Sequence, residues 1–200
     1  MGSVEISKER VESLKTGHKV LAEYRYEPAE VDKGYAGHTL YVNVSDNSVA
    51  TKPVDEKMKR TFVGGRGFGL WRLWNAVDDD TRWDDPENEI NIASGPLGGT
   101  THFPGSGKSL VVGISPLTGS VMDSNVGGYF GPLLKFAGWD ALEIQGKAEQ
   151  DVIILIDGKP AGAVNRAGVV RETRPGYGRA TTASTTFQSV SHHPCRCRHL

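Results

Sequence analysis

The chain has 200 residues, which suits one domain of ordinary size, and its 38% hydrophobic and 24% charged residues match an ordinary globular composition. A formal net charge of −1 gives no electrostatic reason to expect a nucleic acid or an anionic membrane as partner. No apolar run approaches the roughly 20 residues that span a bilayer, and the charged N-terminus lacks the apolar core of a signal peptide, so we expect a cytoplasmic protein without membrane contact.

The first part of the chain predicts a leader followed by a hairpin. Residues 1–36 offer little apolar periodicity, apart from a short helix expected over 7–16, and we interpret them as a leader. Within 39–54, apolar residues recur at every second position from Leu40, which is the period of a half-buried strand. Turn-forming residues at 45–48 interrupt the pattern, so 39–54 is predicted to be a β-hairpin.

A helical region is predicted next. Asp55 is placed to cap a helical turn that ends at Phe62. After a glycine run at 64–69, four apolar and aromatic residues fall at helical spacing, and we expect their face to be core rather than a cofactor contact: Leu70, Leu73, Trp74 and Val77. The acidic segment 78–88 lacks the ligand spacing of a calcium loop and is predicted to be a solvated loop.

The second half of the chain alternates strands with a helix. Strands are expected at 89–93, 110–114, 141–144 and 152–156, with a loop at 123–128 and a helix at 132–137. The wholly apolar strand 152–156 is expected to be central in its sheet. Strands therefore dominate and helices are interspersed, which predicts the α+β class and one main domain over 37–165.

The last part of the chain, 166–200, differs in composition from the rest. It holds six arginines and no lysine, whereas the first 165 residues hold eleven lysines. A flexible basic tail and a change of reading frame or truncation both account for this, and we leave the two open. Cys195 and Cys197, with nearby histidines, have metal-binding chemistry, but their spacing matches no zinc site or disulfide framework.

Glycine is concentrated in residues 95–138. Eleven of the chain's 25 glycines lie there, and four more lie at 64–69. Glycine lowers the stability of helices and strands by roughly 0.5–1 kcal/mol relative to alanine, so its concentration indicates close backbone approach or positive φ. A large polar ligand held by backbone N–H groups fits this pattern, and so does a set of tight turns between short strands.

Two apparent nucleotide motifs in this region fail on inspection. Gly107-Lys108-Ser109 imitates the end of a phosphate-binding P-loop, but His102 stands where glycine is needed and a strand follows instead of a helix. The run 64–69 also fails the dinucleotide fingerprint. What remains is Lys108 in a glycine-rich turn and the Asn125-Val126-Gly127-Gly128 loop, which together can bind an anion. No nucleophile–base pair and no paired carboxylates are evident from the sequence.

Several separated motifs resemble one protein family. These are ASGPLGGT at 93–100, SPLTG at 115–119, DSNVGGYFG at 123–131, LKFAGWD at 134–140 and EIQGKAE at 143–149. Their sequence and order resemble the N-terminal domain of tungsten-containing aldehyde:ferredoxin oxidoreductases. The resemblance covers about residues 39–160. It implies a β-rich domain of two β-half-barrels that forms a base for the cofactor.

The resemblance also implies a cofactor and the residues that hold it. The cofactor is a tungsten ion held by two pterin dithiolenes, with magnesium bridging the pterin phosphates. Lys108 stands where the family has arginine, so a two-point contact to the cofactor becomes a single-point one. Asn125 and Gly127 match the family's Asn-x-Gly loop at the cofactor, and the Asn125 backbone carbonyl is implied as a magnesium ligand.

By the same resemblance, the complete enzyme is much longer. The cysteines of its 4Fe-4S cluster and further pterin-binding motifs belong to later segments, and Cys195 and Cys197 do not match the cluster spacing. The implied reaction oxidises aldehydes to carboxylates with ferredoxin as acceptor, in a homo-oligomer of the full-length enzyme, and we expect this chain alone to lack turnover. Two alternatives stay open, a family member that reduces another low-potential carbonyl or aromatic substrate and a non-catalytic β-rich binding or assembly module.

Overall fold

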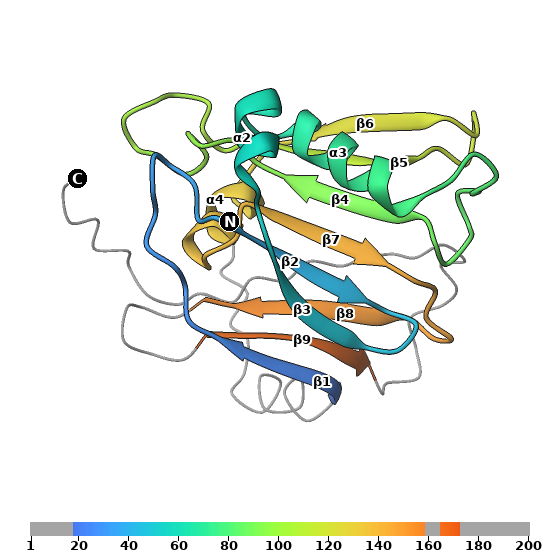
Figure 1. Ribbon diagram of the computed structural model, residues 1–200. Coiled ribbons are helices and arrows are strands. Elements are labelled where there is room, and N and C mark those ends of the chain that lie inside the picture. The colour runs from blue at the N-terminus through green and yellow to red at the C-terminus, as the bar shows by residue number, and fades with distance from the viewer. Residues whose placement is uncertain (1–17, 159–164, 173–200) are drawn as a thin grey trace, which may run out of the picture.

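The computed structural model describes residues 18–158 and 165–172, and its strands form two sheets (Figure 1). The larger sheet has six strands in the order β3-β2-β7-β4-β5-β6, and the smaller has three in the order β1-β9-β8. The strands are β1 His18–Tyr26, β2 His38–Asn43, β3 Ser48–Pro53, β4 Glu89–Ala93, β5 Ser109–Ile114, β6 Val121–Val126, β7 Ala141–Gln145, β8 Val152–Asp157 and β9 Asn165–Glu172. The helices within the same residues are α2 Glu56–Phe62, α3 Arg66–Ala76 and α4 Phe130–Phe136. This arrangement confirms the α+β class.

The main hydrophobic core joins the two sheets. Leu40 and Val42 of β2 and Leu142 of β7 are fully buried in it, together with Ile154 of β8 and Val169 of β9. Successive side chains of a strand point to opposite faces, so these alternate positions turn one face of the larger sheet toward the smaller sheet. The predicted hairpin 39–54 is confirmed by β2 and β3, which pair from His38↔Pro53 to Asn43↔Ser48.

Helices α2 and α3 cover part of the opposite face of the larger sheet (Figure 1). Asp55 caps α2 as predicted, because its carboxylate accepts a hydrogen bond of 2.6 Å from the Met58 backbone N–H. Helix α3 packs closely on β5 because Gly69 has no side chain. A Cβ at Gly69 would lie 2.6 Å from a methyl carbon of Val112.

The buried face of α3 differs from the prediction. The helix begins at Arg66, inside the glycine run, and buries Phe68, Gly69 and Leu73. Of the expected face, Leu70 is 37% exposed and Trp74 is 83% exposed. The expectation that Trp74 belongs to the core is therefore wrong. The physical reason is that the glycines allow the nearest approach to the sheet, and they turn the large side chain of Trp74 outward.

Two strand predictions also need correction. Residues 123–126, expected to be a loop, belong to strand β6, which pairs antiparallel with β5 through Asp123↔Val112 and Asn125↔Leu110. Strand β6 lies at the sheet edge and is largely exposed, so it needs no apolar alternation that a sequence pattern could show. Strand β8, expected to be central, is an edge strand of the smaller sheet, whereas β7 occupies a central place in the larger one.

The ends of the described chain contribute to the fold more than the sequence suggests. Strand β1 lies within the segment expected to be a leader, and β9 begins at the end of the expected main domain and continues beyond it. They pair with each other, and Tyr26 of β1 packs on Trp139 with 4.4 Å between ring centroids. Strand pairing between such distant parts of the chain leaves little pattern in the local sequence. The expected helix 7–16 and the tail beyond Glu172 lie outside the described residues, and the domain boundaries stay predictions.

The buried carboxylate of Asp140 connects three parts of the chain. It forms an ion pair with Lys135 of α4 and accepts hydrogen bonds from the backbone N–H groups of Ala36 at 3.1 Å and Gly37 at 2.7 Å. The Lys135 side chain is 6% exposed and the Asp140 side chain is 1% exposed. Lys135 also donates to the Gly34 carbonyl at 3.1 Å. The pair therefore holds the segment before β2 against the turn between α4 and β7.

None of the helices in the described ranges has the length and apolar character needed to cross a membrane.

We predict that Asp140→Asn destabilises the fold strongly, because it leaves the buried Lys135 charge without its partner. Breaking a buried ion pair in this way costs about 3–5 kcal/mol. Urea unfolding at pH 7 measures the loss. Glu56→Gln is the matched control, because it breaks the Lys59–Glu56 pair in which the carboxylate is 72% exposed. Equal losses for the two variants would contradict the central role of Asp140.

Candidate functional site

The predicted cofactor residues lie at one end of the larger sheet. Lys108 directly precedes β5, and the Gly127-Gly128 turn directly follows β6. Because β5 and β6 are antiparallel, with Ser109 opposite Val126, these two loops meet at the same end of the strand pair. Their backbones are in close contact. A Cβ at Gly107 would lie 2.8 Å from the carbonyl oxygen of Gly128, so a side chain at residue 107 has no room.

The structure brings Lys108 and Gly127 together. A Cβ at Gly127 would lie 3.6 Å from Lys108 Nζ, so the ammonium group stands directly over this stretch of backbone. Lys108 is exposed, and it has no ion pair within residues 18–158 and 165–172. Asn125 is exposed on the adjoining edge strand, two residues before Gly127. We call the three residues that are predicted to bind the cofactor, Lys108, Asn125 and Gly127, the cofactor platform.

A second cation stands beside the cofactor platform. Arg66, at the start of α3, forms an ion pair of 2.8 Å with Asp123 of β6, and both side chains are partly exposed. Asp123 is two residues before Asn125, so its carboxylate would otherwise repel an anion at the platform. The pair neutralises that carboxylate and leaves the positive charge of Lys108 in excess.

These features fit an anionic ligand with phosphate groups. The backbone of Gly127 and Gly128 is exposed, and the ammonium group of Lys108, which has no ion pair among the described residues, provides a point charge. An extended pterin with phosphates has this chemistry, so the residues present fit the group implied by the resemblance. Cys195 and Cys197 lie outside the described residues, and within those residues no cluster of three or more His, Cys, Asp or Glu could hold a metal ion.

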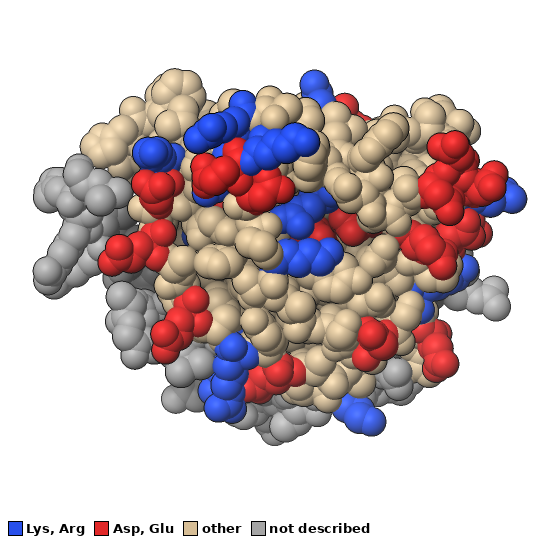
Figure 2. Space-filling view, in the orientation of Figure 1, with Lys and Arg blue, Asp and Glu red and all other residues tan. Residues whose placement is uncertain are grey.

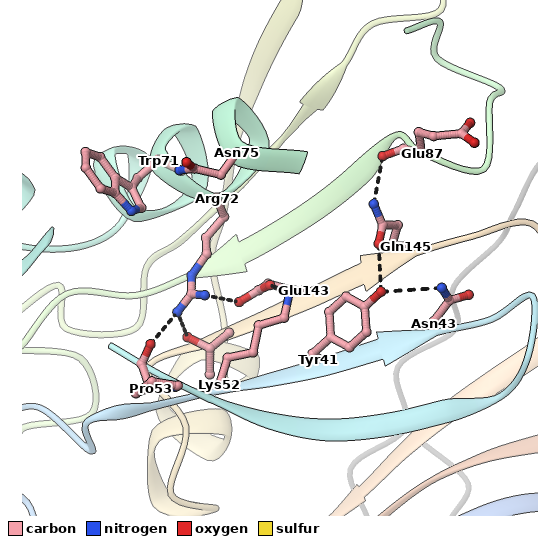
Figure 3. A network of polar contacts seen from close by, with 11 residues as sticks. Tyr41, Asn43, Lys52, Pro53, Trp71, Arg72, Asn75, Glu87, Glu143 and Gln145 are labelled. Carbon is pink, nitrogen blue, oxygen red and sulfur yellow. Dashed lines mark hydrogen bonds and ion pairs between the residues drawn. The ribbon is translucent and has the colours of Figure 1, made fainter. Parts of the chain in front are cut away.

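A buried polar network lies on the face of the larger sheet that carries α2 and α3 (Figure 3). At its centre is Glu143 of β7, 1% exposed, whose carboxylate oxygens lie 2.6 Å from Lys52 Nζ and 2.9 Å from Arg72 Nη1. Arg72 reaches down from α3 and also donates to Thr39 Oγ1 and to the Pro53 carbonyl, each at 3.0 Å. One guanidinium group thus ties the helix to three strands.

The network continues toward the other end of the sheet from the cofactor platform. The Tyr41 hydroxyl donates to Gln145 Oε1 at 2.7 Å, and Gln145 Nε2 donates to the Glu87 carbonyl at 2.9 Å. Glu89 of β4 lies opposite Gln145 in the strand register and is 2% exposed. Two carboxylates, Glu89 and Glu143, are therefore buried on one face of adjacent strands.

This carboxylate pair is not among the residues predicted from the sequence. Glu89 and Asn91, and likewise Glu143 and Gln145, stand at alternate positions in strands that are otherwise apolar. Alternation of polar with apolar residues is the available signal, since it marks a second, polar face of the same strand. The pairing of β4 with β7, which brings the two carboxylates together, has no local sequence signature.

The pKa of Glu89 is raised from 4.5 to about 6, chiefly by burial and also by the negative charge of Glu143, while the Asn91 side chain, Lys52 and Arg72 oppose the shift. The native state therefore binds the Glu89 proton more tightly than the unfolded state does. It follows that stability is lost as pH rises through the window between these two pKa values.

We predict that Glu89→Gln stabilises the protein at pH 7 by about 2 kcal/mol, because a neutral amide avoids the cost of ionising a buried group. Below the unfolded pKa the wild-type carboxyl is neutral as well, so the difference between the two proteins disappears. Urea unfolding of both proteins at pH 7 and at pH 4 measures the two differences. The same stabilisation at both pH values would contradict the assignment of the shifted pKa to Glu89.

Comparison with known proteins gives a consistent family. The model of the family "Aldehyde ferredoxin oxidoreductase, N-terminal domain" matches residues 39–170. Tungsten-containing aldehyde ferredoxin oxidoreductases of Pyrococcus horikoshii and Pyrococcus furiosus are 43% and 42% identical over 124 and 123 residues, which is 62% of this chain. The "Aliphatic sulfonate oxidoreductase, WOR-like subunit" of Pyrococcus furiosus is 34% identical over 125 residues, or 61% of this chain. The chain spans 20% of the length of each of these relatives.

A solved structure is also similar. It is the active-site complex BamBC of benzoyl coenzyme A reductase in complex with 1,5-dienoyl-CoA, with a TM-score of 0.61 and 28% identity. The similarity covers 72% of this chain and 20% of that one. The family match covers more than half of the chain, includes both loops of the cofactor platform and confirms the resemblance seen in the sequence. The chain therefore belongs to the family of aldehyde ferredoxin oxidoreductase N-terminal domains.

Proposed function

We propose that the chain is the N-terminal, tungstopterin-binding part of an oxidoreductase that oxidises aldehydes to carboxylates with ferredoxin as electron acceptor. The observation that carries the proposal is the ammonium group of Lys108, which stands directly over the Gly127 backbone and has no ion pair in the described part of the chain. The names of the relatives at 43% and 42% identity support tungsten as the metal and an aldehyde as the substrate.

The residues of the cofactor platform would divide the work of binding. Lys108 would contact a phosphate or the pterin as a single-point cation, and Gly127 would let the ligand approach the backbone. The Asn125 backbone carbonyl would be a ligand of the magnesium ion that bridges the phosphates. Arg66 would keep the Asp123 carboxylate neutralised beside the bound anion.

The remaining parts of the proposal concern the complete protein. When bound, the tungsten–bis-pterin group supplies the redox centre, and a 4Fe-4S cluster held by later segments would pass electrons to ferredoxin. The two sheets would belong to the two β-half-barrels of the base. We propose a cytoplasmic homo-oligomer, with this chain acting as a partial platform that has no turnover by itself.

A second candidate keeps the family but changes the substrate. The 28% identical benzoyl coenzyme A reductase complex favours reduction of an aromatic ring or another low-potential substrate. A non-catalytic binding or assembly module is the third candidate. Tungsten analysis together with pterin fluorescence on the purified protein separates the first two candidates from the third, because only a module would contain neither group.

We predict that Lys108→Gln in the complete protein weakens cofactor retention by roughly ten- to a hundredfold, the effect of losing one charged hydrogen bond. Lys108→Arg should retain the cofactor at least as well, because guanidinium makes a two-point contact. Tungsten and pterin content after dialysis measures both. Lys147→Gln is the control, since Lys147 follows β7 at the opposite end of the sheet. Equal retention in all three variants would contradict the role of Lys108.

We also predict that the 200-residue chain by itself does not oxidise aldehydes. Aldehyde-dependent reduction of a viologen dye, measured beside tungsten content, is the assay. Stoichiometric tungsten with turnover in this chain would overturn the proposal of a partial platform.

A further inference from the structure

A polar cleft of about 510 Å³ opens between α2, α3 and the larger sheet. Its walls include Lys52 of β3, Trp71 and Arg72 of α3, Glu89 of β4 and Glu143 of β7. Figure 2 shows basic and acidic side chains meeting in a recess on this face, below the helices. The cleft lies toward the end of β4 that is remote from the cofactor platform, so the inference below is independent of the proposed function.

The charges that line the cleft do not balance. It contains two cations, Lys52 and Arg72, and three carboxylates, Asp55, Glu89 and Glu143. Both cations are paired with Glu143, at 2.6 and 2.9 Å. Asp55 is occupied as the cap of α2, where it accepts from the Met58 backbone N–H. Lys52, Arg72 and Glu143 together carry a charge of +1, and Asp55 and Glu89 bring the net charge of the cleft to −1.

Glu89 is also short of hydrogen-bond donors. It is 2% exposed, and its Oε1 atom has no hydrogen-bond partner in the part of the chain that the structure describes. A buried carboxylate oxygen without a donor is costly, and a hydrogen bond to a charged group is stronger than one between neutral groups. A ligand that brings an N–H donor and one positive charge would give this oxygen a partner and offset the net charge of the cleft.

We propose that the polar cleft binds a small organic cation, a primary ammonium or a guanidinium group, which donates a hydrogen bond to Glu89. A divalent metal ion fits less well, because it requires several oxygen ligands and Glu143 is already held by Lys52 and Arg72. An anionic ligand fits less well, because the side chains that line the cleft already have a net charge of −1. Trp71 in the wall supplies an aromatic surface, which suits the alkyl part or the charge of such a cation.

The test is an NMR titration of the protein with n-butylammonium chloride and with methylguanidinium chloride at pH 7. Tetramethylammonium chloride is the control ligand, because it has the charge but no N–H donor. We expect saturable binding of at least one of the two donors and none of the control. Glu89→Gln should weaken that binding by roughly ten- to a hundredfold. Circular dichroism of the variant verifies that it is folded.

Two further measurements separate a specific site from general attraction. Lys52→Met leaves the cleft one charge more negative and should tighten binding of the donor, while Arg72 still holds Glu143. Acidification should weaken binding, because protonated Glu89 has no charge to offer. Equal binding of tetramethylammonium, equal binding by Glu89→Gln, or no saturable binding of either donor by the wild-type protein would overturn the proposal.

Discussion

The buried Asp140 carboxylate is the point on which the arrangement of the larger sheet depends. Its side chain takes the Lys135 ammonium group and two backbone N–H groups, and its own backbone bonds to His38 at 2.8 Å and to Ser94 at 3.3 Å. The starts of β2 and β7 and the end of β4 are thereby joined at one residue. Trp139 beside it fills the core. Within the family motif at 134–140, Lys135, Trp139 and Asp140 thus have structural roles in the fold.

The two faces of the larger sheet, which this junction holds together, differ in polarity and in what covers them. One face is apolar and packs on the smaller sheet, which supplies most of the burial that stabilises the fold. The other face is polar near Glu143 and is only partly covered by α2 and α3. Buried polar groups need hydrogen-bond partners, and Arg72 supplies several of them by bonding to three strands at once. Glu89 is left outside that network.

The parts of the fold that sequence reasoning predicted are those with local causes. The hairpin 39–54 follows from alternation and turn residues, and the Asp55 cap follows from one side chain and one helix start. Strand β6 and the pairing of β1 with β9 were not predicted, because an exposed edge strand and a long-range pairing leave no periodic pattern of apolar residues in the sequence. The predicted orientation of α3 was wrong at Trp74, because the close packing of Gly69 on Val112 decides which face of the helix is buried.

In the candidate site, too, features with local causes were predicted and features that depend on strand pairing were not. Resemblance predicted which residues form the cofactor platform, but only the antiparallel register of β5 and β6 explains why Lys108 stands over Gly127. The proximity of Glu89 and Glu143 could not be predicted from the sequence, because they meet only through the pairing of β4 with β7. A buried carboxylate with an unmet oxygen reduces stability, and strongly perturbed groups of this kind concentrate at functional sites. Under the two proposals, the charges at the two ends of the sheet, positive at Lys108 and negative at Glu89, bind ligands of opposite sign.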